Sequence, residues 1–303
     1  MKKNSIYLTL SLITMMLWGS LYPCIKLGYK AFDIDTTNVS QILMFAGVRF
    51  ILCGIIITVF AVLRKEKLAR KSIGYIALAG FFTIILHYTC TYIGLALTNS
   101  SKTAILKQLG TLFYICFAFL FVKEEKFSIN KIIGAIVGFC GIVAINSGPG
   151  GGELSLGDAL IILASVCTVA GSLASKKALK NTTPIMFTGI SQLFGGTFLL
   201  ITAFSMGGEM VNFNSKSVPI LAYICAASIV AYCLWNYVIS KTELSKNFII
   251  KFAEPLFACI FGAILLGEDI FKWQYLVSFV LISLGIVIGN LSNKKIKVIR
   301  ENV

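Results

Sequence analysis

Ten apolar runs, each long enough to cross a lipid bilayer, follow one another along the chain with short gaps between them. They lie near residues 6–26, 41–63, 73–97, 103–122, 129–147, 157–176, 184–206, 218–240, 247–266 and 271–291. About 20 apolar residues in a helix span the hydrocarbon core of a bilayer. Such runs are too long for barrel strands, and a helix satisfies its backbone groups within its own segment. The pattern therefore predicts an all-α integral membrane protein with ten transmembrane helices.

The charged residues sort to the two sides of the predicted membrane. Charged residues are 13% of the chain, about half the share of a typical soluble protein, and the net charge is +14. With the N-terminus inside, 19 lysines and arginines fall in inner loops and tails and 5 in outer loops. The positive-inside rule then places both termini in the cytoplasm and the protein in the cytoplasmic membrane. The charge reports topology, so we expect lipid as a partner and no nucleic acid.

No motif in the sequence indicates an enzyme, a metal site or a cofactor. The nine cysteines are scattered through apolar spans without a Cys-x-x-Cys pair, so they predict neither a disulfide nor a metal. The glycine-rich stretch 148–152 lacks the Gly-Lys-Ser/Thr ending of a phosphate-binding loop. We also find no Ser/His/Asp set and no paired carboxylates. The glycine-rich stretch is therefore expected to be a linker.

The sequence repeats itself at an offset of 144 residues. Without a gap between residues 88 and 146, Tyr88 matches Tyr232 and Lys107 matches Lys251. Each copy holds five spans, an odd number, so the second copy enters the membrane from the opposite side. The halves are predicted to be inverted repeats related by a pseudo-two-fold axis in the membrane plane, as in many secondary transporters. The predicted parts are a first repeat at 1–147, an extracytoplasmic linker at 148–155, and a second repeat with a basic cytoplasmic tail at 156–303.

Short motifs mark the first and ninth spans. The first reads Trp18-Gly19-Ser20-Leu21-Tyr22-Pro23, followed by Lys26, and the ninth reads Glu254-Pro255-Leu256-Phe257-Ala258. Together with Arg49 in the second span, they resemble the EamA-type transporters of the drug/metabolite transporter superfamily over nearly the whole chain. The resemblance implies ten spans in two related halves, and efflux or sometimes uptake of small metabolites such as amino acids without ATP hydrolysis. Thr111 stands where the family has a proline in the fourth span, which puts a kink symmetric with that at Pro255 in doubt.

Charged residues inside spans are costly in lipid and usually face a cavity or a partner. Lys107 and Lys251 are predicted to flank a central cavity and to attract a carboxylate or phosphate; alternatively, both snorkel to their nearest interfaces. Glu254 lies three residues after Lys251, on the same helical face, and is the candidate for binding a coupling proton. Its alternative role is a fixed ion pair with Lys251, or a bond to backbone freed by Pro255. Arg49 is expected to be structural, satisfied by carbonyls of neighbouring helices.

Aromatic and polar residues at helical spacing complete the predicted cavity. Besides the two lysines, its expected lining is Trp18, His87, Tyr88, Tyr92, Tyr232, Trp235 and Asn236. Aromatic walls with a few hydrogen-bonding groups suit a small organic ligand, although ordinary packing between helices predicts a similar stripe. Pro23, Arg49 and Pro255 are assigned structural or gating roles.

These features predict a secondary active transporter that exports a small metabolite such as an amino acid by alternating access. A second possibility is import or exchange of an anionic metabolite, such as an organic phosphate or a nucleotide-linked compound. The alternative of another class is a membrane scaffold or sensor that transports nothing. A scaffold has no need of charged groups at matched positions in inverted repeats. We expect a small-molecule substrate and a coupling proton as further partners.

Overall fold

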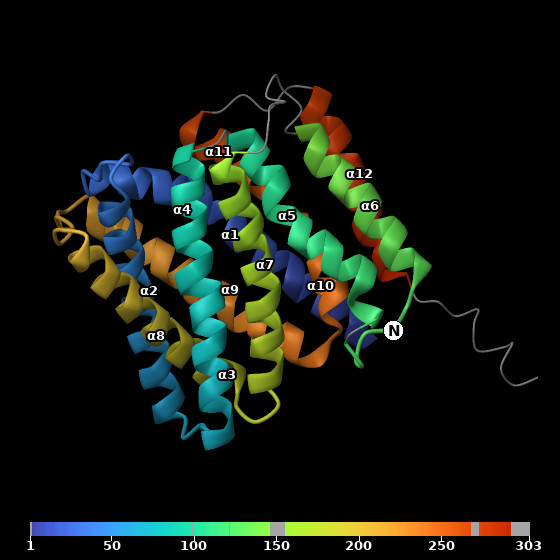
Figure 1. Ribbon diagram of the computed structural model, residues 1–303, viewed down its shortest axis with the longest axis horizontal. Coiled ribbons are helices and arrows are strands. Elements are labelled where there is room, and N and C mark those ends of the chain that lie inside the picture. The colour runs from blue at the N-terminus through green and yellow to red at the C-terminus, as the bar shows by residue number, and fades with distance from the viewer. Residues whose placement is uncertain (1, 98–99, 121, 146–154, 268–272, 292–303) are drawn as a thin grey trace, which may run out of the picture.

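The computed structural model describes residues 2–97, 100–120, 122–145, 155–267 and 273–291. Within these ranges the chain is helical, with one isolated bridge between Leu68 and Thr182 and no strand. The helices pack side by side in one bundle (Figure 1). The predicted linker 148–155 lies almost wholly outside the described residues.

The first half of the chain forms the first five spans. Its elements are α1 (Lys2–Ala31), α2 (Val39–Leu63), α3 (Arg70–Gly80), η1 (Phe81–Leu86), α4 (His87–Leu97), α5 (Ser100–Phe117), η2 (Ala118–Leu120) and α6 (Ile129–Ile145). The third span runs through α3, η1 and α4 without interruption. Because η1 is a π-helical segment, its wider turn shifts the faces of α4 relative to those of α3. The fourth span passes through Thr111 as continuous α-helix, so it has no break to match the one described below at Pro255.

The second half forms the other five spans. Its helices are α7 (Leu156–Ala178), α8 (Pro184–Ser205), α9 (Ser217–Lys241), α10 (Leu244–Lys251), α11 (Glu254–Leu266) and α12 (Trp273–Asn290). Capping residues fix where two of them begin. Ser155 and Asp158 form a reciprocal capping box at α7, and Thr183 caps α8 directly before Pro184.

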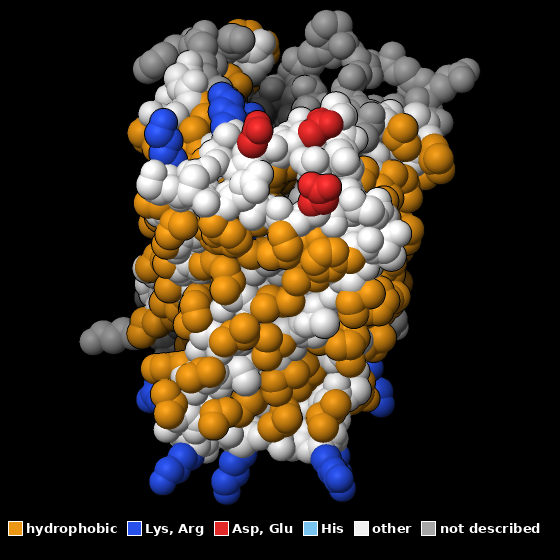
Figure 2. Space-filling model, turned by 90° about the vertical axis from the view of Figure 1, so that its left-hand side faces the viewer, with side chains coloured by type: hydrophobic (Ala, Val, Ile, Leu, Met, Phe, Trp, Pro, Cys, Tyr) orange, Lys and Arg blue, Asp and Glu red, His pale blue; other side chains and the backbone are white. Residues whose placement is uncertain are grey.

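The length and composition of the helices fit a bilayer. Among the described residues, eight helical stretches are long and apolar enough to cross a membrane. Two shorter apolar helices, Leu106–Leu120 and Ile129–Ala144, coincide with the fourth and fifth predicted spans. On the side where α2 and α8 lie, an apolar belt separates lysines and arginines at one end from acids and a few lysines at the other (Figure 2). The prediction of an all-α fold of ten transmembrane helices is confirmed.

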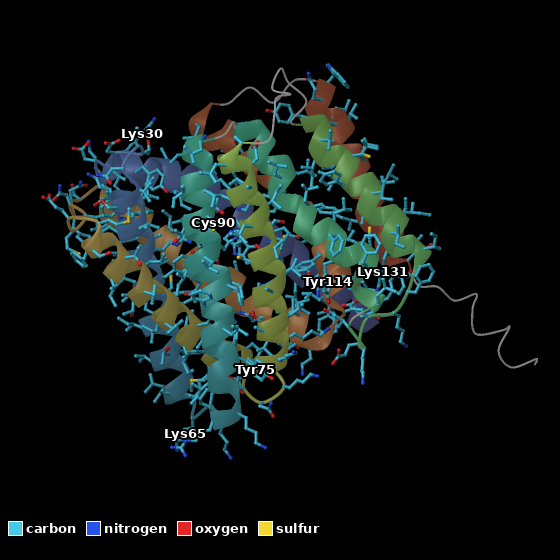
Figure 3. All side chains as sticks on the ribbon, viewed as in Figure 1. Lys30, Lys65, Tyr75, Cys90, Tyr114 and Lys131 are labelled. Atoms are coloured by element: carbon cyan, nitrogen blue, oxygen red, sulfur yellow. The ribbon has the colours of Figure 1, made fainter. Side chains whose placement is uncertain are left out.

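We call the end of the bundle where α2 ends and α3 begins the basic end. Its loops and the adjoining helix ends carry the following cations: Arg64, Lys65, Lys67, Arg70, Lys71, Lys177 and Lys180. Lys65 and Tyr75 lie at this end, whereas Lys30 lies at the opposite end (Figure 3). Thr182 donates to the carbonyl of Lys67, so the loop before α3 and the loop before α8 meet here.

Helices that are equivalent in the two repeats pack against each other in opposite directions. Along α2 and α8, Gly47 lies against Leu200, Gly54 against Leu193 and Gly196 against Ile51, so one residue number rises as the other falls. α6 and α12 pair in the same way. A Cβ atom at Gly134 would lie only 2.5 Å from the backbone nitrogen of Gly289, so the two backbones approach as closely as glycine allows. The halves are therefore inverted repeats, as the odd number of spans predicts.

The ninth span is broken in the middle. The sequence predicts one helix over 247–266, but the structure has α10 up to Lys251 and α11 from Glu254. Proline has no N–H to donate, so Pro255 cannot bond to the carbonyl of Lys251 and the helix is interrupted there. Lys251 thus lies at the carbonyl end of α10 and Glu254 at the amide end of α11. The dipole of α10 favours the positive charge of Lys251 at its carbonyl end, and the dipole of α11 favours the negative charge of Glu254 at its amide end.

Candidate functional site

One face of α1 brings together the two lysines that the repeat relates. Trp18 and Tyr22 are four residues apart, so both side chains lie on the same face of the helix. The ammonium of Lys107, from α5, lies 5.8 Å from the centre of the Tyr22 ring and 3.5 Å from its hydroxyl. The ammonium of Lys251, from α10, lies 5.8 Å from the centre of the Trp18 ring. Both lysines are half-buried and point to this face one helical turn apart.

Glu254 joins the same cluster through Tyr22. The Tyr22 hydroxyl donates to Oε1 of Glu254 over 2.8 Å. Glu254 is only 9% exposed, and its second oxygen, Oε2, is buried without a hydrogen-bond partner in the described part of the chain. The ion pairs found there do not include Lys251 with Glu254. The carboxylate thus has one oxygen held by the protein and one oriented to accept a further donor.

Two tyrosines that are equivalent in the repeats touch each other at the centre of the bundle. The hydroxyl groups of Tyr88 on α4 and Tyr232 on α9 are 3.3 Å apart. A two-fold axis that exchanges two residues lies midway between them. The contact of Tyr88 with Tyr232 therefore marks the position of the pseudo-two-fold axis. Tyr232 packs edge-on against Trp18 with ring centres 5.4 Å apart, which connects the axis to the lysine cluster.

Arg49 lies beside this axis and is 2% exposed. Its Nη2 donates to the Tyr88 hydroxyl over 3.2 Å, and its guanidinium carbon lies 4.4 Å from the centre of the Phe50 ring. These contacts are a phenol and an aromatic face, and the carbonyl partners that the sequence predicts for Arg49 stay a prediction. A guanidinium is weakly hydrated and stacks well on aromatic rings, so such surroundings suit it.

The other predicted lining residues divide between the cluster and helix contacts. Trp235 packs on Trp18 with ring centres 5.3 Å apart and is 6% exposed. Nδ1 of His87 lies 3.1 Å from the carbonyl of Ala164 on α7. Nδ2 of Asn236 donates to Thr188 Oγ1 on α8 over 2.9 Å. His87 and Asn236 therefore make contacts between helices, as the packing alternative predicts.

Tyr92 lies in α4, but its side chain is outside the described part of the structure. Pro23 is buried inside the continuous α1, directly after Tyr22. A proline within a helix frees the carbonyl four residues earlier, which here belongs to Gly19. Gly19 packs directly against Phe257 of α11, close enough that a Cβ atom there would clash. The gating role predicted for Pro23 and Pro255 stays a prediction.

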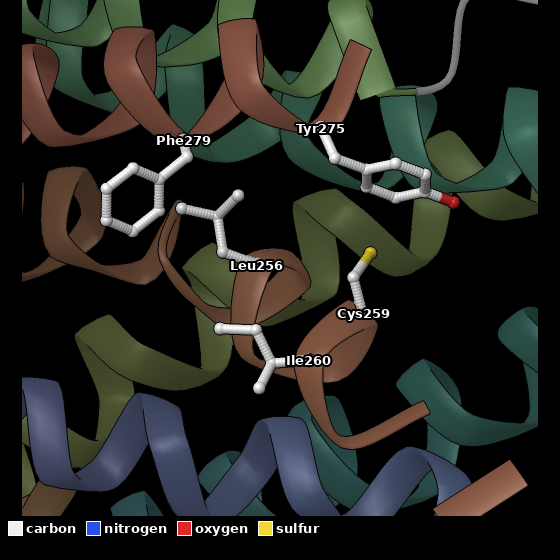
Figure 4. A pocket seen from close by; sticks show the side chains of 5 residues that line it. All are labelled: Leu256, Cys259, Ile260, Tyr275 and Phe279. Carbon is white, nitrogen blue, oxygen red and sulfur yellow. The ribbon is translucent and has the colours of Figure 1, made fainter. Parts of the chain in front are cut away.

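A separate cavity lies between α11 and α12, away from the charged cluster. Its volume is about 140 Å³, and Leu256, Cys259, Ile260, Tyr275 and Phe279 line it (Figure 4). Leu256 and Cys259 come two and five residues after Glu254, which places them roughly 140–200° around α11 from it. Sites for small molecules usually exceed about 300 Å³ and carry convergent polar groups. This apolar cavity does not meet that description.

A second charged cluster, which the sequence does not reveal, lies at the basic end of the bundle. Glu125, in the linker before α6, accepts hydrogen bonds from the backbone and hydroxyl of Ser245 and from the Tyr114 hydroxyl. Lys131 binds Glu125 over 3.2 Å and Glu243 over 2.6 Å. Tyr114 and Lys131 lie close together in Figure 3. In sequence, these residues look like an ordinary polar linker and a helix start.

The surroundings of Glu125 keep it ionised. Burial alone would raise the pKa of its carboxyl, but the hydrogen bonds from Ser245 and the charge of Lys131 outweigh burial and hold the pKa below its usual value. A lowered carboxyl pKa stabilises the folded state above the unfolded pKa of about 4.3, and that contribution is lost as the pH falls through the folded pKa. Glu125 is thus ionised at neutral pH.

Comparisons with known proteins agree with this architecture. The "uncharacterized inner membrane transporter YedA" of Escherichia coli (strain K12) is 28% identical over 293 residues, which cover 89% of this chain and 88% of that protein. The "uncharacterized transporter YvbV" of Bacillus subtilis (strain 168) is 26% identical over 284 residues, covering 92% and 90%. A solved crystal structure shares the fold with a TM-score of 0.77 at 15% identity, covering 94% of this chain and 96% of that one.

The EamA-like transporter family matches the chain twice, over residues 5–147 and 155–291. The two matches correspond to the two inverted halves of the bundle, and the relatives named as transporters align over most of their length. The chain therefore belongs to the EamA-like transporter family and is a multi-pass membrane transporter.

Proposed function

We propose that this transporter is a secondary active exporter of a small metabolite such as an amino acid, working by alternating access. The family assignment supports transport rather than the scaffold or sensor role. The observation that carries the proposal is the cluster of Lys107, Lys251 and Glu254. Two ammonium groups suit a substrate carboxylate, and the buried Oε2 of Glu254 suits a donor such as a substrate ammonium group.

Glu254 is also our candidate for coupling transport to a proton gradient. A carboxylate with one oxygen held by Tyr22 and one without a partner among the described residues has room for a proton. A proton and a substrate ammonium group would use the same oxygen, so binding of one would displace the other. Competition of this kind produces exchange of a proton for substrate without any ATP site.

A second candidate function is import or exchange of an anionic metabolite. The observation that favours it is the charge of the cluster, in which two lysines face one acid. The Lys107 ammonium is near a hydroxyl and an aromatic ring, so it retains donors for an anion. A phosphate group would use both lysines as point charges.

Purified protein in liposomes is expected to exchange labelled amino acids across the membrane. Candidate substrates come from comparing the metabolites that cells retain with and without the protein. Uptake of labelled substrate into vesicles loaded with the same unlabelled compound measures exchange, and protein-free liposomes are the control. Exchange of organic phosphates but not amino acids would favour the second candidate, and exchange of neither would contradict the proposed function.

We propose that the basic end faces the cytoplasm, with both termini on that side, because of the excess of lysine and arginine in its loops. In a background without the nine native cysteines, Lys67→Cys is expected to resist an impermeant thiol reagent applied to intact cells. Thr36→Cys is the matched control at the opposite end, where the residue is exposed, and it should react. Labelling of position 67 from outside would show that the basic end faces away from the cytoplasm, opposite to the proposed orientation.

A further inference from the structure

The charged cluster at the basic end joins the two halves of the protein. We call Glu125, Lys131, Glu243 and Ser245 the Glu125 network. Glu125 and Lys131 belong to the first half, and they are 5% and 4% exposed. Glu243 and Ser245 belong to the second half, where Glu243 directly precedes α10. Every contact between these pairs therefore crosses the boundary between the repeats.

The network acts on the helix that also carries a residue of the central cluster. Ser245 is near the start of α10 and Lys251 is its last residue, so about 9 Å of helix separates them. A turn at Phe252 and Ala253 separates α10 from α11, and Pro255 removes a hydrogen bond that would otherwise link them. A short helix that the network holds at one end and that meets such a weak point at the other can tilt as a unit. Its movement would displace Lys251.

The chemistry of the network suits a junction that opens and closes. Buried ion pairs often stabilise a protein no better than apolar side chains of similar volume. When such a junction opens, however, each charged group regains its water, whereas an opened apolar seam exposes surface that water disfavours. An ionic junction therefore lowers the cost of the open state relative to an apolar one.

We propose that the Glu125 network is a latch that closes the substrate path at the basic end, and that it must open to give this end access to the central cluster. The inference rests on the proposed alternating access. In the described structure the latch is closed. Ser11 on α1 is 0% exposed, and its hydroxyl donates to Asn247 of α10 over 3.3 Å. Ser11 lies two helical turns from Trp18 toward the basic end, so it lies between the central cluster and that end.

The test measures how fast a thiol at position 11 reacts. Ser11→Cys is introduced into the background without native cysteines, and the purified protein is placed in lipid nanodiscs, where both faces are accessible. In Glu125→Gln, a thiol reagent should label position 11 about tenfold faster, as expected from the loss of charge-assisted bonds. The matched control is Glu124→Gln, the same change one residue away. Glu124 pairs with Lys180 at the exposed surface, where ion pairs contribute little, so labelling should not change.

Equal labelling rates in folded Glu125→Gln and Glu124→Gln would overturn the latch. If Glu125→Gln fails to fold, Ser245→Ala provides the test instead, because it removes one hydrogen-bond donor to Glu125 without changing a charge. Faster labelling in Ser245→Ala supports the latch, and an unchanged rate contradicts it. Because labelling requires neither substrate nor a gradient, this result is independent of the exchange assay for the proposed function.

Discussion

Replacing Glu254 with glutamine is expected to abolish transport driven by a pH gradient while substrate exchange continues. The amide keeps the shape of the side chain and still accepts the hydrogen bond from Tyr22, but it cannot take up a proton. Exchange moves no net proton, so it should continue at saturating substrate, although losing the charge that faces a substrate ammonium group weakens binding. Both activities are measured in the same proteoliposomes, with and without an imposed pH difference.

Two control variants separate coupling from folding in this experiment. Tyr22→Phe removes the hydroxyl that donates to Glu254 but leaves the carboxylate, so coupling should weaken without being lost. Glu254→Gln combined with Lys251→Met removes the neighbouring cation as well. It tests whether an uncompensated buried charge, which costs about 3–5 kcal/mol, explains any loss of folded protein. If folded Glu254→Gln still accumulates substrate in response to pH, the proton role is wrong.

Replacing Lys107 or Lys251 with methionine is expected to weaken substrate binding strongly. A hydrogen bond to a charged group contributes about 1.5–3 kcal/mol, so the half-saturating concentration should rise about ten- to hundredfold for each variant. Methionine fills a similar volume without the charge. Lys→Arg should rescue poorly, because a planar guanidinium does not replace a compact ammonium group.

The matched control for the lysine variants is Lys67→Met, which removes an exposed lysine at the basic end. Its concentration dependence should equal that of the unaltered protein. Concentration dependence is read from initial rates of exchange in proteoliposomes, after equal amounts of folded protein are confirmed. Unchanged exchange by the double variant Lys107→Met with Lys251→Met would show that neither ammonium group meets the substrate.

The fold could be predicted from the sequence because both of its determinants are repetitive. The length of the apolar runs locates the spans. The repeat that matches Lys107 with Lys251 contains five spans in each copy, and this odd number predicts the inversion. The sequence predicts that these lysines flank one cavity with Trp18, but not that both contact the same face of α1, since that depends on how α5 and α10 tilt toward it. Tyr22 belongs to the motif of the first span, but only the structure shows its hydroxyl donating to Glu254.

Other features of the structure have weak signals in the sequence. The π-helical segment before His87 consists of apolar residues and Thr83, and no periodicity distinguishes it from α-helix. Pro255 predicts a kink, and the structure interrupts the helix over only Phe252 and Ala253, which keep right-handed helical dihedral angles. The Glu125 network was missed because its members are far apart in sequence and each resembles a loop charge. Only the packing of the two halves brings Ser245 to Glu125.

The contact between Tyr88 and Tyr232 differs in kind from a contact between non-equivalent residues of the two halves, such as that of Ser245 with Glu125. If the halves exchange conformations during a cycle, each contact between non-equivalent residues is replaced by its counterpart on the opposite side of the membrane. A contact between equivalent residues is different, because exchanging the two halves gives the same contact again. The exchange therefore leaves it in place. The two hydroxyl groups can therefore stay together in both states, and the halves can turn about them as about a fixed pivot.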